Sequence, residues 1–175
     1  VLQTARGTKA APTAVNSGTI LGAYRFGGYD GTAFNDIHSC ELRGNATETW
    51  TATAHGTSLN FATIANGATL PTDRMIIDQN GNVGLGLSSP SVKLHQDNGT
   101  ATANFHKFTA NATTGQAAGD GFDIGLDASG NAIIDQNENL AMIFNTNNTE
   151  RMRILSGGNV GIGLSAPSVK LQVDG

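Results

Sequence analysis

The sequence has little of what most enzymes and binding domains depend on. Charged residues make up 14% of its 175 residues, against about 25% in an ordinary soluble domain, and aromatic residues make up 6%. The net charge is −4, and no lysine or arginine cluster supplies the basic surface that nucleic-acid binding requires. No run of about 18 apolar residues occurs. We therefore expect neither a nucleic-acid partner nor insertion into a membrane.

Residues that hold metals or cofactors are also scarce. A single cysteine, Cys40, excludes a disulfide framework and a thiolate zinc site. The four histidines lack the spacing of metal ligands. The string GNVGLG has the wrong spacing for a dinucleotide fingerprint, and no helix is expected after it. The opening residues contain no apolar core before a cleavage site, so we expect no signal peptide. The sequence thus predicts no metal and no cofactor.

Glycine, with 23 residues, is abundant, and part of it belongs to an internal repeat. Residues 73–97 read DRMIIDQNGNVGLGLSSPSVKLHQD, and residues 150–174 read ERMRILSGGNVGIGLSAPSVKLQVD. Sixteen of these 25 positions are identical at an offset of 77 residues, without a gap. We expect two diverged copies of one module, at residues 1–97 and 98–175.

The modules have the pattern of short strands. Apolar and polar residues alternate with period two, as in residues 45–54 (NATETWTATA) and 138–145 (ENLAMIFN). Turn pairs such as Asn80-Gly81 and Gly130-Asn131 separate the alternating segments. No stretch longer than about ten residues has a capped 3.6-residue apolar stripe. The fold class is therefore predicted as all-β.

The repeated string GNVGLGL/GNVGIGL predicts a surface for packing between chains. Alternation places the larger residues on one face and only glycine on the other, although a twisted or bulged strand also accounts for the glycines. We expect neighbouring copies of the chain to press against the glycine face. The residues predicted to pack are Val83, Leu85, Leu87, Gly84, Gly86, Val160, Ile162, Leu164, Gly161 and Gly163.

Three segments carry a resemblance to a known family. NTNNTERMRI at 145–154, followed by GGNVGIGLSAPSVKLQVDG, resembles the repeated segments of bacteriophage tail fibres. Residues 5–34 are similar to the start of modules in that family, and residues 120–144 to the strands before the ERMRI string. Many such fibres continue into a C-terminal intramolecular chaperone domain that is cleaved off. Because the sequence stops at Gly175, where that domain would begin, we expect a processed chain or a fragment.

The resemblance implies an elongated, β-rich homotrimeric fibre built from repeated short-strand modules. Such a fibre lies on the exterior of the virion tail, is assembled in the host cytoplasm, and supports attachment to the bacterial surface. The implied partners are further copies of the chain, other virion tail proteins, and a surface receptor that is a polysaccharide or an outer-membrane protein. Two alternatives remain open: a tailspike that depolymerises surface polysaccharide, and a fibre or adhesin mounted elsewhere than the tail.

Candidate catalytic groups have simpler explanations in the sequence. Asp120 and Asp127 adjoin glycine turns, and Asp123 and Asp127 on one strand would lie about 13 Å apart, too far for a glycosidase pair. Asp135 is the remaining aspartate of this acidic group in the second module. Cys40 beside His38 is a candidate nucleophile, but no oxyanion motif accompanies it. His95 aligns with Gln172 in the second copy, so a metal role for His95 is disfavoured. Arg74 and Arg151 are interpreted as solvated charge pairs with Asp73 and Glu150. The sequence thus predicts no catalytic residue.

Overall fold

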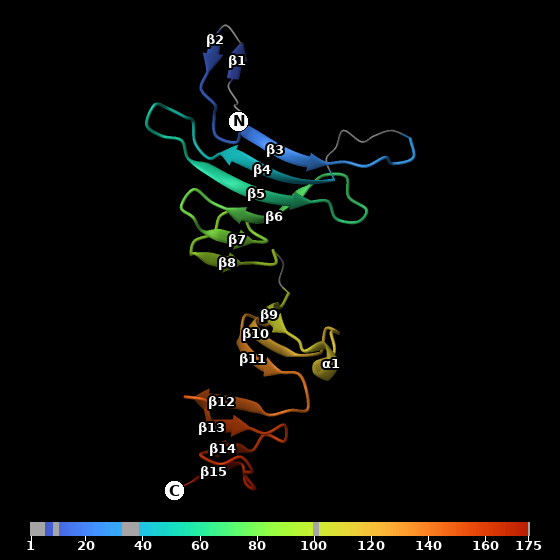
Figure 1. Cartoon of the computed structure of the whole chain (residues 1–175), viewed down its shortest axis with the longest axis vertical. Coiled ribbons are helices and arrows are strands. Elements are labelled where there is room, and N and C mark those ends of the chain that lie inside the picture. The colour runs from blue at the N-terminus through green and yellow to red at the C-terminus, as the bar shows by residue number, and fades with distance from the viewer. Residues whose placement is uncertain (1–5, 9–10, 33–38, 100–101, 175) are drawn as a thin grey trace. The chain divides into compact units, whose positions relative to one another are not determined.

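The described chain consists almost entirely of short strands. The computed structural model describes residues 6–8, 11–32, 39–99 and 102–174 (Figure 1). The first half of the chain contains β1 (Arg6–Thr8), β2 (Ala11–Thr13), β3 (Ile20–Phe26), β4 (Cys40–Ala46), β5 (Thr57–Thr63), β6 (Thr72–Ile77), β7 (Val83–Leu85) and β8 (Leu94–Gln96). The second half contains β9 (Asn104–Phe108), α1 (Asn111–Thr114), β10 (Phe122–Leu126), β11 (Ala132–Gln136), β12 (Met142–Thr146), β13 (Thr149–Ile154), β14 (Val160–Ile162) and β15 (Leu171–Val173). The predicted all-β class is confirmed.

The chain divides into two compact units, Val1–Thr100 and Ala101–Gly175. In the first unit, strands β3 to β8 form one sheet in chain order, and β1 pairs with β2 (Figure 1). The second unit contains a three-stranded sheet of order β11-β10-β9 and a four-stranded sheet of order β12-β13-β14-β15. The division falls just after Asp97, where the first copy of the sequence repeat ends.

The sequence repeat is a structural repeat. Strands β6, β7 and β8 recur as β13, β14 and β15, each displaced by the same 77 residues, and each copy ends in a parallel strand pair. A β-bulge interrupts the preceding pairing in both copies, at Phe61/Ala62 and at Phe144/Asn145. The copies differ in the hairpin before the repeat: the first has a loop at 64–71, whereas Asn147 and Asn148 form a two-residue turn with φ of 50° and 56°. Positive φ at both positions is what a type I′ turn requires.

One turn geometry joins the first and second strands of each repeated segment. The amide of Asp78 donates to the carbonyl of Asn82 at 2.9 Å, and Leu155 donates to Asn159 at the same distance. The asparagine that ends each turn also donates through its side chain to the carbonyl of the proline that follows, Asn82 to Pro90 and Asn159 to Pro167. The repeated asparagine therefore fixes both the turn and the loop beyond it.

The repeated glycines serve contacts within the chain. Strand β7 ends at Leu85, and β14 ends at Ile162, so Leu87 and Leu164 lie outside the strands and the alternation predicted across all seven residues is wrong. Gly84 and Gly161 are buried, and a Cβ atom on Gly84 would lie 2.9 Å from the Ile76 side chain of the same chain. The space beside these two glycines is thus occupied by the chain itself.

The last glycine of each repeated string allows an unusually short link between parallel strands. Parallel neighbours commonly need a crossover of a dozen or more residues, yet residues 86–93 alone connect β7 to β8. Gly86 and Gly163 have φ of 81° and 80°, and their amides donate to the carbonyls of Arg74 and Arg151. A Cβ atom on Gly86 would collide with the carbonyl oxygen of Asp97. Glycine is therefore required where the chain leaves the strand.

A second expectation from the sequence is also wrong. Residues 45–54 alternate as a strand would, but β4 ends at Ala46, and the segment after it forms a loop that returns to β5. Hydrogen bonds from Thr47 to Gly56 and from Thr51 to Ala54 close this loop, and the amide of Trp50 donates to the carbonyl of Val15. Threonines alternate with other residues in this segment, but the segment forms a loop and does not pair with a strand.

Replacing Gly86 with alanine is expected to destabilise the chain more than replacing a glycine that has open space around it. Gly86→Ala combines a left-handed φ with a backbone collision, and we expect a loss of about 2 kcal/mol or more in the free energy of unfolding. Gly67→Ala is the control, because Gly67 has a φ of 78° but no atom within 4 Å of its Cβ position. It should cost about 1 kcal/mol. Urea denaturation of both variants measures the difference, and equal losses would contradict this account of the link.

Candidate interaction surface

Burial in the first sheet is the reverse of what a folded domain normally shows. Along β5, the small or polar residues Ser58, Asn60 and Ala62 are buried, whereas Leu59 and Phe61 are each 39% exposed. Asn60 is only 4% exposed. Soluble domains usually bury large apolar side chains and expose amides. Strand β5 therefore points its apolar side chains away from the chain's own interior.

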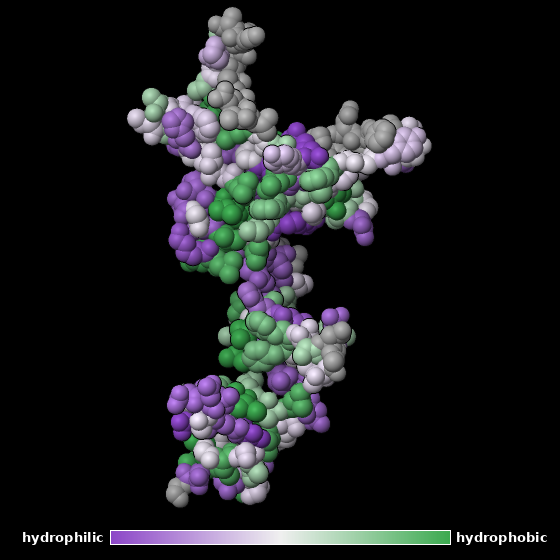
Figure 2. All heavy atoms as spheres, viewed as in Figure 1, coloured by the Kyte–Doolittle hydropathy of each residue, from purple (hydrophilic) through white to green (hydrophobic). Residues whose placement is uncertain are grey.

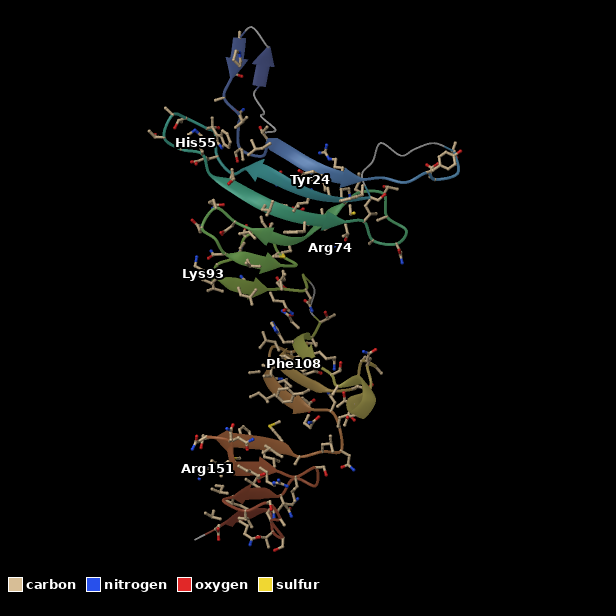
Figure 3. The ribbon with its side chains drawn as sticks, viewed as in Figure 1. Tyr24, His55, Arg74, Lys93, Phe108 and Arg151 are labelled. Atoms are coloured by element: carbon tan, nitrogen blue, oxygen red, sulfur yellow. The ribbon has the colours of Figure 1, made fainter. Side chains whose placement is uncertain are left out.

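Strand register extends this arrangement across the whole six-stranded sheet. Directly opposed residues lie on the same side of a sheet, so the partners of Phe61 and Leu59 define one surface. We call it the apolar face of the first unit. It contains Tyr24, Phe26, Leu42, Leu59, Phe61, Met75, Ile77, Val83, Leu85 and Leu94. Hydrophobic residues gather over β5 to β8 in the view of Figure 2, and Tyr24 lies on β3 in Figure 3.

Both sheets of the second unit repeat the pattern. In the four-stranded sheet, one surface carries Met142, Phe144, Met152, Ile154, Val160, Ile162, Leu171 and Val173. Phe144, Leu171 and Val173 are exposed there. In the three-stranded sheet, Phe108, Ile124 and Ile134 share a face and are exposed. Every sheet of more than two strands in the described chain therefore has one uncovered apolar face.

The opposite face of the first sheet holds a network of ion pairs and amides. The Glu41 carboxylate is paired with Arg25 at 3.0 Å and with Arg43, and Arg43 also reaches Asp73 at 2.6 Å. Asn60 donates to Asp73 at 2.7 Å. These side chains satisfy and cover one another, so this face needs no second layer of structure.

Two opposing effects determine the ionisation of Glu41. Burial of its carboxyl acts to raise the pKa, but hydrogen bonds from Arg25 and Arg43, together with their charges, outweigh burial. The pKa of Glu41 therefore lies below its ordinary value of 4.5. A folded-state pKa that is depressed means that the ionised carboxylate stabilises the fold above about pH 4.5. That stability is lost as the pH falls through the folded-state pKa.

The accessible area of the chain is large for its mass. The chain exposes 11969 Å² at 18.0 kDa. One globular protein of this mass would expose about 8,000 Å², and two separate globules of half the mass about 9,700 Å² in total. Among the described residues, the buried hydrophobic ones are only Val15, Ala46, Ala62 and Ile76.

The residues predicted to pack between chains fall into three groups. Val83, Leu85, Val160 and Ile162 lie on the apolar faces. Gly84 and Gly161 lie on the opposite face, while Gly86, Gly163, Leu87 and Leu164 lie beyond the strand ends. The sequence pattern missed the larger contributors on the same faces, such as Tyr24, Phe61 and Phe144, because cross-strand register does not follow from local alternation. Their role between chains stays a prediction.

The acidic residues of the second unit include one close pair that the sequence did not predict. Asp123 and Asp135 are direct cross-strand partners on β10 and β11, which places their Cβ atoms about 4.5–5.5 Å apart. Asp123 is 5% exposed, and its Oδ2 accepts hydrogen bonds from Lys107 and Asn137 at 2.9 Å each. The hydrogen bond from Lys107 outweighs desolvation and lowers the pKa of Asp123 below 3.8. A general acid of a glycosidase needs the opposite shift.

The remaining candidates have structural partners. Asp120 accepts a hydrogen bond from the Ala117 amide, and Asp127 accepts hydrogen bonds from Ser129 and Asn131 in its turn. His38 lies outside the described residues, so its relation to Cys40 is not part of the structure. In the part of the chain that is described, no group of three or more His, Cys, Asp or Glu residues is arranged to hold a metal ion.

His95 accepts the same loop hydrogen bond as Gln172, its counterpart in the second copy. The amide of Ser91 donates to Nδ1 of His95 at 3.3 Å, and the amide of Ser168 donates to Oε1 of Gln172 at 3.0 Å. A neutral imidazole and a glutamine side chain both accept such a hydrogen bond. The alignment of His95 with Gln172 therefore reflects a shared loop contact.

No helix in the described ranges is long and apolar enough to cross a membrane.

The described residues thus define a protein made of single-layer β modules, each with one face left uncovered. No protein-family model and no curated protein matches the chain. One solved structure similar to it is the carboxy-terminal domain of the bacteriophage T5 L-shaped tail fibre, with 18% identity over 49% of this chain and a TM-score of 0.43. A second is the same domain with its intramolecular chaperone domain, with 18% identity over 49% of this chain and a TM-score of 0.42.

The likeness is one of fold, and it covers 31% of the first solved chain and 22% of the second. This chain therefore spans a third or less of the tail-fibre structures that it matches. Both of these solved chains come from a phage tail fibre, the class of protein that the sequence segments resemble.

Removing the charge of Glu41 is expected to weaken the fold and to change how its stability depends on pH. Glu41→Gln should lower the free energy of unfolding at pH 7 by about 1–3 kcal/mol, because two arginines lose a charged partner. It should also reduce the loss of stability seen when wild-type protein is acidified below about pH 4.5. Denaturation curves from pH 3 to pH 7 measure both effects.

Glu48→Gln is the matched control for this experiment. Glu48 accepts a hydrogen bond from the Gly56 amide, and the glutamine carbonyl oxygen can accept the same bond. An equal change in both variants would contradict the assigned role of the Glu41 network.

Proposed function

We propose that this chain is a structural module of a phage tail fibre that assembles as a homotrimer and supports attachment to the bacterial host surface. The observation that carries the proposal is the reversed burial: the polar face of the first sheet is internally satisfied, while the apolar faces are exposed. A single-layer sheet in this condition is completed by apolar surface from outside its own chain. Further copies of the same chain supply it.

A closed assembly of identical chains accounts for the repeat. Each copy of the repeated segment presents matching apolar positions, such as Phe61 and Phe144 on the strands that precede β6 and β13. Rotation about one axis brings the same surfaces together at every module, as closed cyclic symmetry requires. The three-chain number comes from the resemblance to tail fibres. The account therefore places Val83, Leu85, Val160 and Ile162 at contacts between chains.

In this proposal the fibre lies on the exterior of the virion tail, is assembled in the host cytoplasm, and contacts other tail proteins. Its receptor on the host is a surface polysaccharide or an outer-membrane protein. Three identical chains present every site three times, so weak individual contacts add to strong attachment. Such a module works as a rigid spacer whose apolar surface is used for assembly.

A charge placed on the apolar face should disrupt assembly, and the neighbouring residue provides a control. Phe144→Asp introduces a carboxylate at a proposed contact and should convert the trimer to monomers or aggregates, as measured by sedimentation equilibrium. Ile143→Asp introduces the same charge one residue earlier, on the face that pairs with Arg153. The two residues have similar exposure, 44% for Phe144 and 48% for Ile143. The control should remain trimeric.

Equal effects of the two substitutions would contradict the assignment of the apolar face to assembly. Retention of the trimer by both variants would place the contact elsewhere, and loss of the trimer in both would indicate general unfolding. Circular dichroism of each variant separates unfolding from dissociation.

We further propose that the chain does not cleave polysaccharide. The close pair Asp123 and Asp135 contains a carboxylate bound to Lys107 with a lowered pKa, which disfavours it as a proton donor. Incubation of the purified protein with bacterial capsular polysaccharide and lipopolysaccharide should leave their chain lengths unchanged in size-exclusion chromatography. Shortening that Asp123→Asn or Asp135→Asn abolishes would contradict this proposal and favour the depolymerase.

A further inference from the structure

The sequence repeat retains four charged positions, and two of them have partners within their own module. Asp73 pairs with Arg43, and its counterpart Glu150 forms two contacts of 2.6 Å with Arg153. Lys93 donates to the carbonyl of Asn80, and Lys170 donates to that of Gly157, with distances of 2.8 and 3.0 Å. These residues stabilise the module. The other two repeated positions are an arginine and an aspartate.

The repeated arginine is Arg74 in one copy and Arg151 in the other (Figure 3). The interpretation of these residues as pairs with Asp73 and Glu150 is wrong, because both acids bind other arginines. Instead, Nε of Arg74 donates to the hydroxyl of Thr63 at 2.9 Å, and Nε of Arg151 donates to Thr146 at 3.0 Å. Within the described ranges, neither guanidinium is part of an ion pair.

The bulge places Arg74 at the edge of the apolar face. Arg74 borders a hollow of about 250 Å³ whose lining includes Phe26, Leu42 and Phe61, all from that face. The backbone carbonyl of Arg74 is held by Gly86, and its Nε by Thr63, so the guanidinium is oriented before any partner binds. Both arginines are exposed. An oriented arginine beside an uncovered apolar surface is typical of protein–protein interfaces.

The repeated aspartate is Asp97 in one copy and Asp174 in the other. Each follows the last strand of its copy, and its amide donates at 2.9 Å to the strand beside it, Asp97 to Leu85 and Asp174 to Ile162. Both residues are exposed, and neither carboxylate forms an ion pair with another described residue. Each copy of the repeat therefore leaves one cation and one anion without an oppositely charged partner among the described residues.

We propose that Arg74 and Arg151 bind the carboxylates of Asp97 and Asp174 in a neighbouring copy of the chain. This inference rests on the proposed function, since it requires the chain to assemble. In a cyclic assembly the two sides of each contact differ, so a cation on one side can meet an anion on the other around the whole ring. The planar guanidinium can bind a carboxylate through two parallel hydrogen bonds, which also fixes orientation. Two such contacts between each pair of chains set how the modules align.

Charge reversal on each side, and then on both, tests the pairing. The variants are R74E/R151E, D97R/D174R, and the combination of all four substitutions. Each double variant should weaken association roughly tenfold or more, because like charges then face each other. The fourfold variant has the net charge of the wild type and should recover most of the lost association. Sedimentation velocity over a concentration series measures association for all four proteins.

The results separate this inference from the proposed function. A monomeric wild-type chain would overturn both. An oligomeric wild type whose double variants associate equally well, or whose fourfold variant fails to recover, would overturn the pairing and leave the proposed function standing. A loss of thermal stability that is independent of protein concentration would also overturn the pairing, because it would place the contact within one chain. Recovery of association in the fourfold variant supports it.

Discussion

The structure depends on one constraint: a sheet of a single layer has two faces, and both must be made compatible with water or be covered. In the first sheet, Glu41, Arg43 and Asp73 satisfy one face with hydrogen bonds and ion pairs. The other face carries Leu59 and Phe61 in the open. Covering an apolar side chain of that size is worth about 1.5–3 kcal/mol. The buried hydrophobic residues of the described chain are few, and two of them are the alanines Ala46 and Ala62.

The repeated segment solves a geometric problem that a single-layer sheet poses. The segment must place two parallel strands side by side through a link of a few residues, without adding a layer that would cover the apolar face. Gly86 and Gly163 provide the left-handed φ and the close approach, and the turn asparagines hold the proline loops. The elements that change between copies lie outside this set, as in the hairpin loop at 64–71. The two copies thus share these glycines and asparagines, whereas the loop before the repeat differs between them.

The sequence predicted the features that depend on neighbouring residues and missed those that depend on register. The repeat, the strands and the apolar positions Val83 and Val160 follow from alternation and from direct comparison of the copies. Alternation could not show that β7 stops at Leu85, because the chain leaves the strand at Gly86, which has a φ of 81° and lies next to Asp97 only after folding. Nor could it show that Asp123 is the cross-strand partner of Asp135, or that Arg74 lies at a bulge and does not pair with Asp73.

The central claim is that the apolar faces of this chain are covered by further copies of it. The most direct measurement is the mass of the purified wild-type chain in solution, determined by multi-angle light scattering at micromolar concentration. The account predicts a folded species of three times the chain mass of 18.0 kDa. A stable, well-folded monomer under the same conditions would contradict it.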